Sequence, residues 1–308
     1  MRVAPIGLGL LFVTLVVSCS SDPSPVEGSP TPDAGGRDSA ATPEPDSGTG
    51  ANDAGTDSGG GPLTEQNEVE PNDGKTETEV GAMTLPGQMT GKLDPANDVD
   101  IFGVTLTPGE LYEWTLTPTG GELTPHVTVF DTTPNNLNPT ALVAGTTKGA
   151  PITLQHFVLR PGKFVAAVRD SRNVPNASGA GGPAFGYTLV GRTKAAAPVA
   201  VTFPATKTGK LASLGAVDLY TFTTTNGKGF DIVLRAERKA QPSTLDSRLS
   251  LFDITKKQAI ITNDNAAGTT DSQIGSANGV TGSYMVIVDN EGTNPADLSY
   301  ELEFSLRP

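Results

Sequence analysis

The sequence predicts an all-β protein: two tandem jelly-roll-like β-sandwich domains that follow a signal peptide and a disordered linker. Residues 83–109 recur without a gap at 201–227, with eleven identical positions, so one module is present twice. Short runs alternate apolar and polar residues at a period of two, and clusters of Gly, Pro, Asn and Asp separate these runs. Almost no segment has the period of an amphipathic helix, so we expect strands throughout both modules.

Residues 1–18 are predicted to be an export signal, because Arg2 supplies a positive charge and an apolar run too short to span a bilayer follows it. Residues 16–19, Val-Val-Ser-Cys, resemble the lipobox of bacterial lipoproteins. That resemblance implies a mature N-terminus at Cys19, the only cysteine of the chain, held in a membrane by acyl chains. By the sorting habit of such lipoproteins, Ser20 favours the outer membrane over the inner one. The alternative is an ordinary secretory signal with an unpaired thiol.

Residues 19–63 are predicted to be a disordered, acidic tether. Ser, Pro, Gly, Asp, Thr and Ala dominate it, and Val26 is its one large aliphatic residue before Pro62, so it cannot bury enough surface to fold. A flexible chain of this length has an r.m.s. reach of roughly 35–40 Å. The negative tether and the net charge of −13 disfavour nucleic acid and anionic lipid as partners.

The folded part is divided into residues 64–192 and 193–308. Strands are predicted around residues 102–106, 112–116, 127–129, 152–154, 165–167 and 187–189 in the first module, and around 220–222, 230–234, 249–251, 285–287 and 300–304 in the second. Short antiparallel strands with one apolar face predict two packed sheets in each module.

A series of motifs runs through residues 64–192 in a fixed order: Glu68-Val69-Glu70-Pro71-Asn72-Asp73, Gly91-Lys92-Leu93, Asn97-Asp98-Val99-Asp100-Ile101-Phe102, Val127-Thr128-Val129-Phe130-Asp131, Arg160-Pro161-Gly162-Lys163-Phe164 and Gly186-Tyr187-Thr188-Leu189. In this order they resemble the bacterial pre-peptidase C-terminal domain. That family is a jelly-roll β-sandwich, related to the collagen-binding module of clostridial collagenases and often attached to secreted peptidases. Residues 193–308 resemble it too, through Gly209-Lys210-Leu211 and Ser299-Tyr300-Glu301-Leu302, but without the acidic leader.

Oxygen-bearing side chains predict a calcium site in the first module. The candidates are Glu68, Glu70, Asn72, Asp73, Asp98 and Asp100. The first three alternate, so in an extended segment they point to one side, and Pro71 favours that conformation. Calcium binds six to eight hard oxygen ligands, and the resemblance implies that the leader and the aspartates before the next strand supply them.

The second module lacks most of these residues. At an offset of 118, the leader positions fall on residues without carboxylates, and Asp98 aligns with Ala216. Asp218 remains at the position of Asp100, which suggests that both aspartates also serve the shared fold, for example by accepting hydrogen bonds from backbone amides in the turn. The alternative interpretation is that the leader is a solvated linker end and the aspartates are turn residues. Residues 263–265 with Asp271 form a separate acidic loop that we also consider as a metal site.

No catalytic constellation is predicted. The only histidines, His126 and His156, belong to no zinc-type motif, and a Gly-x-Ser-x-Gly nucleophile elbow is missing. Asp98 and Asp100 would share one strand face, which fits poorly with glycosidase carboxylates that flank a bond from opposite sides. Trp114 and the five tyrosines are expected mainly in the core; the alternative is an exposed aromatic stripe that binds collagen or polysaccharide.

These observations together predict a non-enzymatic, lipid-anchored cell-envelope protein that displays two β-sandwich modules for binding or spacing, the first stabilised by calcium. It would contact the membrane through lipidated Cys19 and bind an extracellular or envelope protein or a polysaccharide, and no nucleic acid. The runner-up is an accessory module that acts in trans for an exported hydrolase such as a peptidase. A purely structural envelope component is a third possibility.

Overall fold

The computed structural model describes residues 61–74, 80–132, 139–174, 176, 178–225, 228–266, 268–276 and 281–307. In these residues the regular structure is β-strand apart from one short 3-10 helix, η2 (Ser171–Asn173), so the prediction of an all-β fold is confirmed. The signal peptide and almost all of the tether, including Cys19 and Ser20, lie outside the described residues. Within the described part of the chain, no helix is long and apolar enough to span a membrane.

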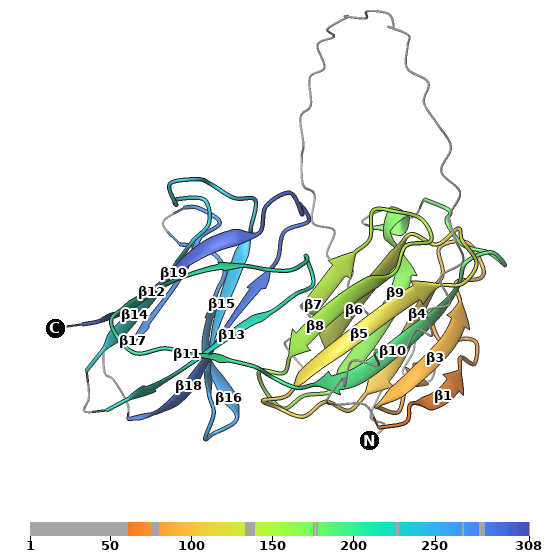
Figure 1. Ribbon diagram of the computed structural model, residues 1–308. Helices are drawn as coiled ribbons and strands as arrows, with labels where there is room; N and C mark the ends of the chain where they lie inside the picture. Colours follow the sequence, from red (N-terminus) through yellow and green to blue (C-terminus); the bar gives the residue numbers. More distant parts are fainter. Residues whose placement is uncertain are drawn as a thin grey trace, which may run out of the picture. The chain divides into compact units, whose positions relative to one another are not determined.

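The first sandwich consists of two five-stranded sheets, with the strand orders β1-β3-β10-β5-β8 and β2-β4-β9-β6-β7 (Figure 1). From β3 to β10 the chain changes sheet at almost every connection, as in a jelly roll. Its strands are β1 (Thr64–Asn67), β2 (Gly81–Ala82), β3 (Gly87–Lys92), β4 (Val99–Val104), β5 (Leu111–Pro118), β6 (Pro125–Asp131), β7 (Pro139–Ala144), β8 (Ile152–Phe157), β9 (Phe164–Asp170) and β10 (Gly186–Lys194).

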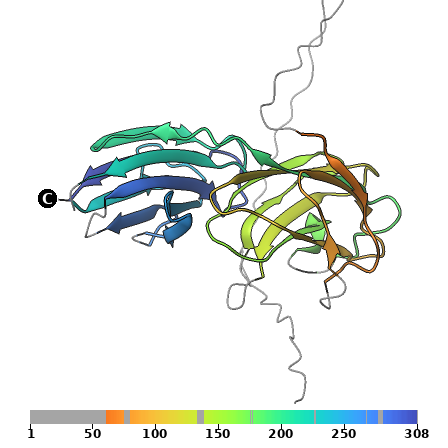
Figure 2. The same ribbon diagram turned by 90° about the horizontal axis from the view of Figure 1, so that it is seen from below.

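The second sandwich repeats this arrangement with the orders β12-β19-β14-β17 and β11-β13-β18-β15-β16. The colours of Figures 1 and 2 run from orange to green in the first sandwich and on to blue in the second. Its strands are β11 (Val199–Ala200), β12 (Ala205–Lys210), β13 (Asp218–Thr224), β14 (Phe230–Arg235), β15 (Ser247–Asp253), β16 (Gln258–Asn263), β17 (Ser272–Ser276), β18 (Gly282–Asn290) and β19 (Ser299–Leu306). One strand of the first sandwich, β1, has no counterpart among the described residues of the second.

The alternating sequence pattern determines which face of each strand is buried. In β4, half-buried and buried residues alternate, so that Phe102 and Val104 enter the core. From the opposite sheet, Trp114 and Tyr187 pack against the same cluster. Burial of one large apolar side chain stabilises the fold by about 1.5–3 kcal/mol, so a strand that slipped by one residue would lose this contribution along its whole length.

The tryptophan and the tyrosines lie in the two hydrophobic cores. Trp114 and the five tyrosines, Tyr112, Tyr187, Tyr220, Tyr284 and Tyr300, are each at most 5% exposed. The expectation that they lie in the core is therefore confirmed, and an exposed Trp or Tyr stripe is ruled out.

Residues 58–308 form one compact unit. The boundary expected between residues 192 and 193 falls inside β10, which continues to Lys194, because these residues keep their pairing with β5. A third apolar cluster joins the sandwiches, where the rings of Phe157 and Phe252 meet edge to face with centroids 5.1 Å apart. Beside it, the backbone N–H of Val217 donates to the Gln155 side chain at 3.0 Å. The two modules are thus packed together through side chains.

Candidate metal centre

The acidic leader enters the first sandwich as an added edge strand. Strand β1 pairs in parallel with β3, and directly after it the backbone N–H of Glu68 donates to the Thr90 carbonyl at 3.0 Å. The Glu68 side chain turns back to the same strand, where its Oε1 accepts from the backbone N–H of Lys92 at 2.6 Å. These contacts hold the leader against the sandwich before it bends at Glu70.

Three of the sequence candidates converge at this bend. One carboxylate oxygen from each of Glu68, Glu70 and Asp100 lies within 4.8 Å of the other two. Calcium–oxygen distances are about 2.3–2.6 Å, so two ligands of one ion lie no more than about 5 Å apart. The spacing of the three oxygens therefore fits a single calcium ion.

Asn72 completes the cluster from the far side of the bend. It is fully buried, and its backbone carbonyl accepts from the Ile101 N–H at 2.9 Å, which ties the leader to β4. One atom of its side-chain amide lies 3.1 Å from Glu70 Oε2 and 2.8 Å from Asp100 Oδ1. The orientation that satisfies both ends of the amide places its nitrogen there, donating to both carboxylates; to ligate a cation between those carboxylates, the amide would have to turn its oxygen toward them.

Burial dominates the electrostatics of the site. Asp100 has no exposed surface, and burial together with the nearby Glu68 and Asp98 charges raises its pKa to about 9. Burial and the Asp98 charge also raise the pKa of Glu70. Without a cation, Asp100 therefore keeps its proton at neutral pH, whereas a divalent ion would favour its ionised form.

Tyr187, which the sequence pattern places in the core, is also a member of the site. Its hydroxyl lies 2.5 Å from Asp100 Oδ2 and 3.2 Å from Glu68 Oε2, so it can donate to either carboxylate. Its recurrence as Tyr300 in the second copy is the sequence signal that could have identified it.

The other two candidates lie around the cluster. The Asp98 carboxylate accepts from the backbone N–H groups of Asp94 at 2.7 Å and Val99 at 2.9 Å, so it holds the turn before β4. Asp73 follows Asn72 and contributes its charge to the raised pKa of Glu70. The structure thus brings Glu68, Glu70, Asn72 and Asp100 together and leaves Asp73 and Asp98 as flanking charges.

In the second sandwich the residue equivalent to Asp100 is Asp218, and the sequence has no acidic leader to lie beside it. The Tyr300 hydroxyl donates to Asp218 Oδ2 at 2.5 Å and lies 2.8 Å from the Tyr220 hydroxyl. Tyr220 stands where the first copy has Phe102, and its hydroxyl replaces the Glu68 carboxylate. The suggested example of backbone amide bonding for Asp100 and Asp218 is wrong: each accepts a buried tyrosine hydroxyl, and the amide-binding aspartate is Asp98.

This tyrosine also explains why the glycine of the Gly-Lys-Leu motif is repeated. A Cβ atom on Gly91 would lie 2.4 Å from the Tyr187 hydroxyl oxygen, and one on Gly209 would lie 2.3 Å from the Tyr300 ring. Both glycines make room for a ring that crosses the strand.

In the acidic loop of the second sandwich, Asp271 holds a turn. Asp271 is fully buried, and its carboxylate accepts from the backbone N–H groups of Ala236 at 2.6 Å and Glu237 at 2.7 Å, and from Arg238 Nε at 2.5 Å. Its oxygens are therefore occupied by a turn. Within the described ranges, Glu68, Glu70 and Asp100 are the one set of three or more His, Cys, Asp or Glu residues whose ligand atoms converge.

The two histidines are buried in the first sandwich. Burial, together with the charge of Arg169, lowers the pKa of His126 to about 4. Burial, with Arg248 nearby, lowers that of His156 to about 3. Both are neutral at physiological pH and less than a tenth exposed, so neither is placed to exchange protons with a substrate.

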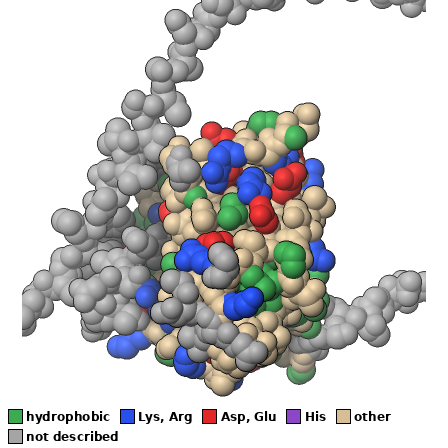
Figure 3. Space-filling view, turned by 90° about the vertical axis from the view of Figure 1, so that its left-hand side faces the viewer, with side chains coloured by type: hydrophobic (Ala, Val, Ile, Leu, Met, Phe, Trp, Pro, Cys, Tyr) green, Lys and Arg blue, Asp and Glu red, His purple; other side chains and the backbone are tan. Residues whose placement is uncertain are grey.

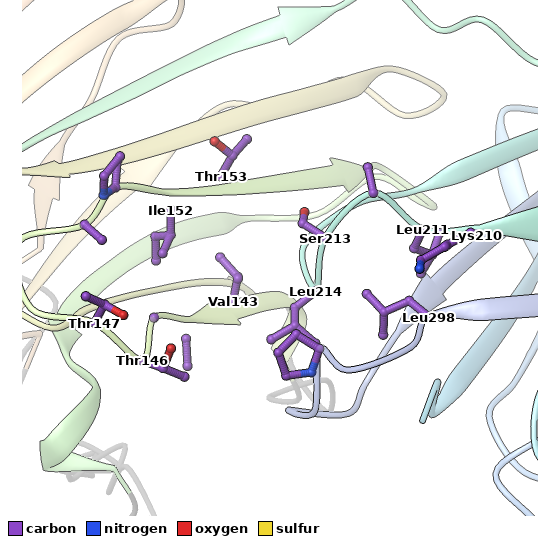
Figure 4. A pocket seen from close by; sticks show the side chains of 16 residues that line it. Val143, Thr146, Thr147, Ile152, Thr153, Lys210, Leu211, Ser213, Leu214 and Leu298 are labelled. Carbon is purple, nitrogen blue, oxygen red and sulfur yellow. The ribbon is translucent and has the colours of Figure 1, made fainter. Parts of the chain in front are cut away.

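A hollow of about 600 Å³ lies where the chain segments around β7, β8 and β12 meet (Figure 4). Its lining is mostly aliphatic or small, with Val143, Ile152, Leu214 and Leu298 among the residues. Lys210 is its one charged lining residue. Its other polar side chains are hydroxyls, such as those of Thr153 and Ser213, and no carboxylate or histidine of the described residues lines it.

No protein-family model and no curated protein matches the chain. Solved structures with partial similarity include the pre-peptidase C-terminal domain of a Bacillus anthracis collagenase, 18% identical, covering 36% of this chain and 98% of that domain at a TM-score of 0.31. The tandem CBM51 modules of a family 98 glycoside hydrolase from Streptococcus pneumoniae are 8% identical, covering 70% of this chain and 83% of theirs at 0.23. The PBSX exported protein XepA is 11% identical, covering 70% and 84% at 0.26.

Proposed function

We propose that this protein is a non-enzymatic, lipid-anchored cell-envelope protein that displays two β-sandwiches as a binding module, the first of them stabilised by calcium. The observation that carries the proposal is the convergence of Glu68, Glu70 and Asp100 beside Asn72. The second copy supports it by contrast, because there Asp218 accepts from the Tyr300 hydroxyl, which in turn meets the Tyr220 hydroxyl, and the sequence has no acidic leader.

A bound calcium ion would supply positive charge at a point where several carboxylates meet. Glu68, Glu70 and Asp100 would ligate it through carboxylates, and Asn72 through its amide oxygen. Because these residues come from the leader and from β4, the ion would tie the exit of the tether to the sandwich. An ion that binds only the folded state stabilises it by RT ln(1 + [L]/Kd).

The anchor and the tether determine how the sandwiches are presented. Acyl chains on Cys19 would hold the protein at the outer membrane, and a tether with a reach of roughly 35–40 Å would let the sandwiches turn freely near the surface. A protein partner is favoured over a polysaccharide, because Trp114 and all five tyrosines are buried and leave no Trp or Tyr platform for sugar stacking.

Titration calorimetry on the chain from residue 20, first stripped with chelator, tests the metal. We expect one calcium ion per chain, and absence of binding heat at millimolar calcium would remove the metal from the proposal.

Metabolic labelling with palmitate tests the lipid anchor. The label should enter the full-length protein and not its Cys19→Ser variant; a full-length protein without label would remove the anchor from the proposal.

A pull-down from the native envelope with the same soluble chain tests the role. A retained envelope protein without turnover supports the binding module. Co-purification of an exported hydrolase would instead favour an accessory module that acts in trans for that enzyme. If no protein is retained, a spacer function remains.

A further inference from the structure

We propose that the open edge of β12 in the second sandwich binds an extended acidic strand of a partner protein. The inference rests on the proposed binding role and names its surface and its class of partner, and it does not depend on calcium. It comes from the difference between the two copies at one edge.

The first sandwich shows how this edge accepts a strand. On β3, the backbone N–H of Thr64 donates to the Pro86 carbonyl at 3.1 Å, and the N–H of Glu68 donates to Thr90 at 3.0 Å. The Gln66 side chain adds two bonds to the backbone of Thr84, donating to its carbonyl at 3.1 Å and accepting from its N–H at 3.0 Å. Backbone pairing and the Gln66 side chain therefore hold β1 in register.

Strand β12 is the counterpart of β3. Both carry Thr-Gly-Lys at the same place, and both pair with the last strand of their sandwich in the same register, Gly91 opposite Tyr187 and Gly209 opposite Tyr300. Among the described strands, however, β19 is the single neighbour of β12, whereas β3 lies between β10 and β1.

The free side of β12 is exposed. Thr206, Thr208 and Lys210 are exposed, and the residues between them are half-buried. By equivalence with Gln88, Thr90 and Lys92, whose backbone faces β1, their N–H and C=O groups point away from β19. A row of such groups is a template for an added strand.

Charge determines which strand fits. Lys207 stands where the first copy has the buried Met89, and no ion pair to it is found among the described residues. An inward-pointing lysine protects an edge against added strands, and an opposing carboxylate is the group that offsets this penalty. In the first copy the residue opposite Met89 in the register is Gln66, so a glutamate at that position of an incoming strand would stand opposite Lys207.

A second carboxylate follows from the same template. Two residues after Gln66, Glu68 accepts from the backbone N–H of Lys92, and the counterpart of that donor is the N–H of Lys210. The partner strand would thus carry Glu-x-Glu. The side of the molecule seen in Figure 3 carries basic and acidic side chains next to one another and no broad field of one sign.

The probe is a fluorescent peptide of residues 63–70 with Gln66→Glu, and its control is the same peptide with Gln66→Lys. We expect saturable binding of the first to the chain from residue 20, measured by anisotropy, and binding of the second that is weaker by roughly threefold to tenfold. No saturation at millimolar peptide, or equal binding of both peptides, overturns the proposal.

Two protein variants test whether the peptide binds at the edge of β12. Thr206→Pro removes an outward N–H but none of the bonds to β19, so the fold should persist while peptide binding falls at least tenfold; unchanged binding would refute edge pairing. Lys207→Glu should reverse the preference between the two peptides, and Lys228→Glu, an exposed lysine off this edge, should not. An unreversed preference overturns the charge argument even if Thr206→Pro destabilises the protein.

Calcium separates this proposal from the metal proposal. The second sandwich lacks the acidic leader, so peptide binding should be the same in calcium and in chelator. If the protein binds the peptide but no calcium, the proposal of a docking edge at β12 stands and only the metal proposal is overturned. A peptide that binds only when calcium is present would overturn the assignment to β12.

Discussion

Replacing Asp100 with asparagine should abolish the response of the protein to calcium without weakening the calcium-free fold. Burial raises the pKa of Asp100 to about 9, so at pH 7.5 the carboxyl holds a proton when no ion is bound. An amide has the same shape as the protonated carboxyl, and its oxygen can still accept from Tyr187 at 2.5 Å. What the substitution removes is the charge that a divalent ion requires.

The size of the calcium response follows from linkage. At a calcium concentration one hundred times Kd, binding adds about 2.7 kcal/mol to the free energy of unfolding. For a unit of 150–250 residues, 1 kcal/mol raises Tm by about 2–4 °C, which gives a rise of about 5–11 °C for the unmodified chain. The Asp100→Asn variant should show no rise.

Differential scanning calorimetry of the chain from residue 20, in chelator and in millimolar calcium, measures this. Asp218→Asn is the matched control, because Asp218 also accepts a buried tyrosine hydroxyl but has no leader beside it, so the calcium shift should remain. A full shift in Asp100→Asn, or no shift in the unmodified chain, would refute the assigned site.

Three further predictions concern the same residues and their packing. In chelator, the free energy of unfolding should fall as pH rises from about 4 to 9. The reason is that the folded state holds a proton on Asp100, with a pKa of about 9, whereas the unfolded chain releases it near the ordinary pKa of 3.8. Urea midpoints measured across this range test this, and an equally steep fall in the Asp100→Asn variant would contradict it. Gly91→Ala should cost about 1–3 kcal/mol, because the new Cβ would lie 2.4 Å from the Tyr187 hydroxyl, while Gly61→Ala, with nothing within 4 Å, should cost nothing in the same urea titration. Phe252→Ala should cost about 3–5 kcal/mol and split the calorimetric transition in two, since Phe252 packs on Phe157 of the other sandwich; a single, unshifted transition would show that this contact does not couple them.

The tyrosine pair shows the limit of local patterns. Asp100 and Asp218 were recognisable as equivalent positions, but the hydroxyl that each one accepts comes from a distant strand, 87 residues away for Tyr187 and 82 for Tyr300. A pattern within a few residues cannot reveal such a partner, so backbone amides were the nearer suggestion. In the structure, the aspartate that accepts hydrogen bonds from backbone amides in this turn is Asp98, whose donors lie within four residues.

The sequence by itself determined the all-β class and the duplication, because period-two alternation and repeated motifs are local properties of the chain; it favoured burial of Trp114 and the tyrosines, which the structure then decided. It also singled out the acidic leader. Only the tertiary structure decided that Glu68, Glu70, Asn72 and Asp100 meet while Asp73 and Asp98 remain beside them, and that β3 is covered where β12 is open. Those outcomes depend on which strands pair across long stretches of chain, and strand pairing is a property of the whole fold.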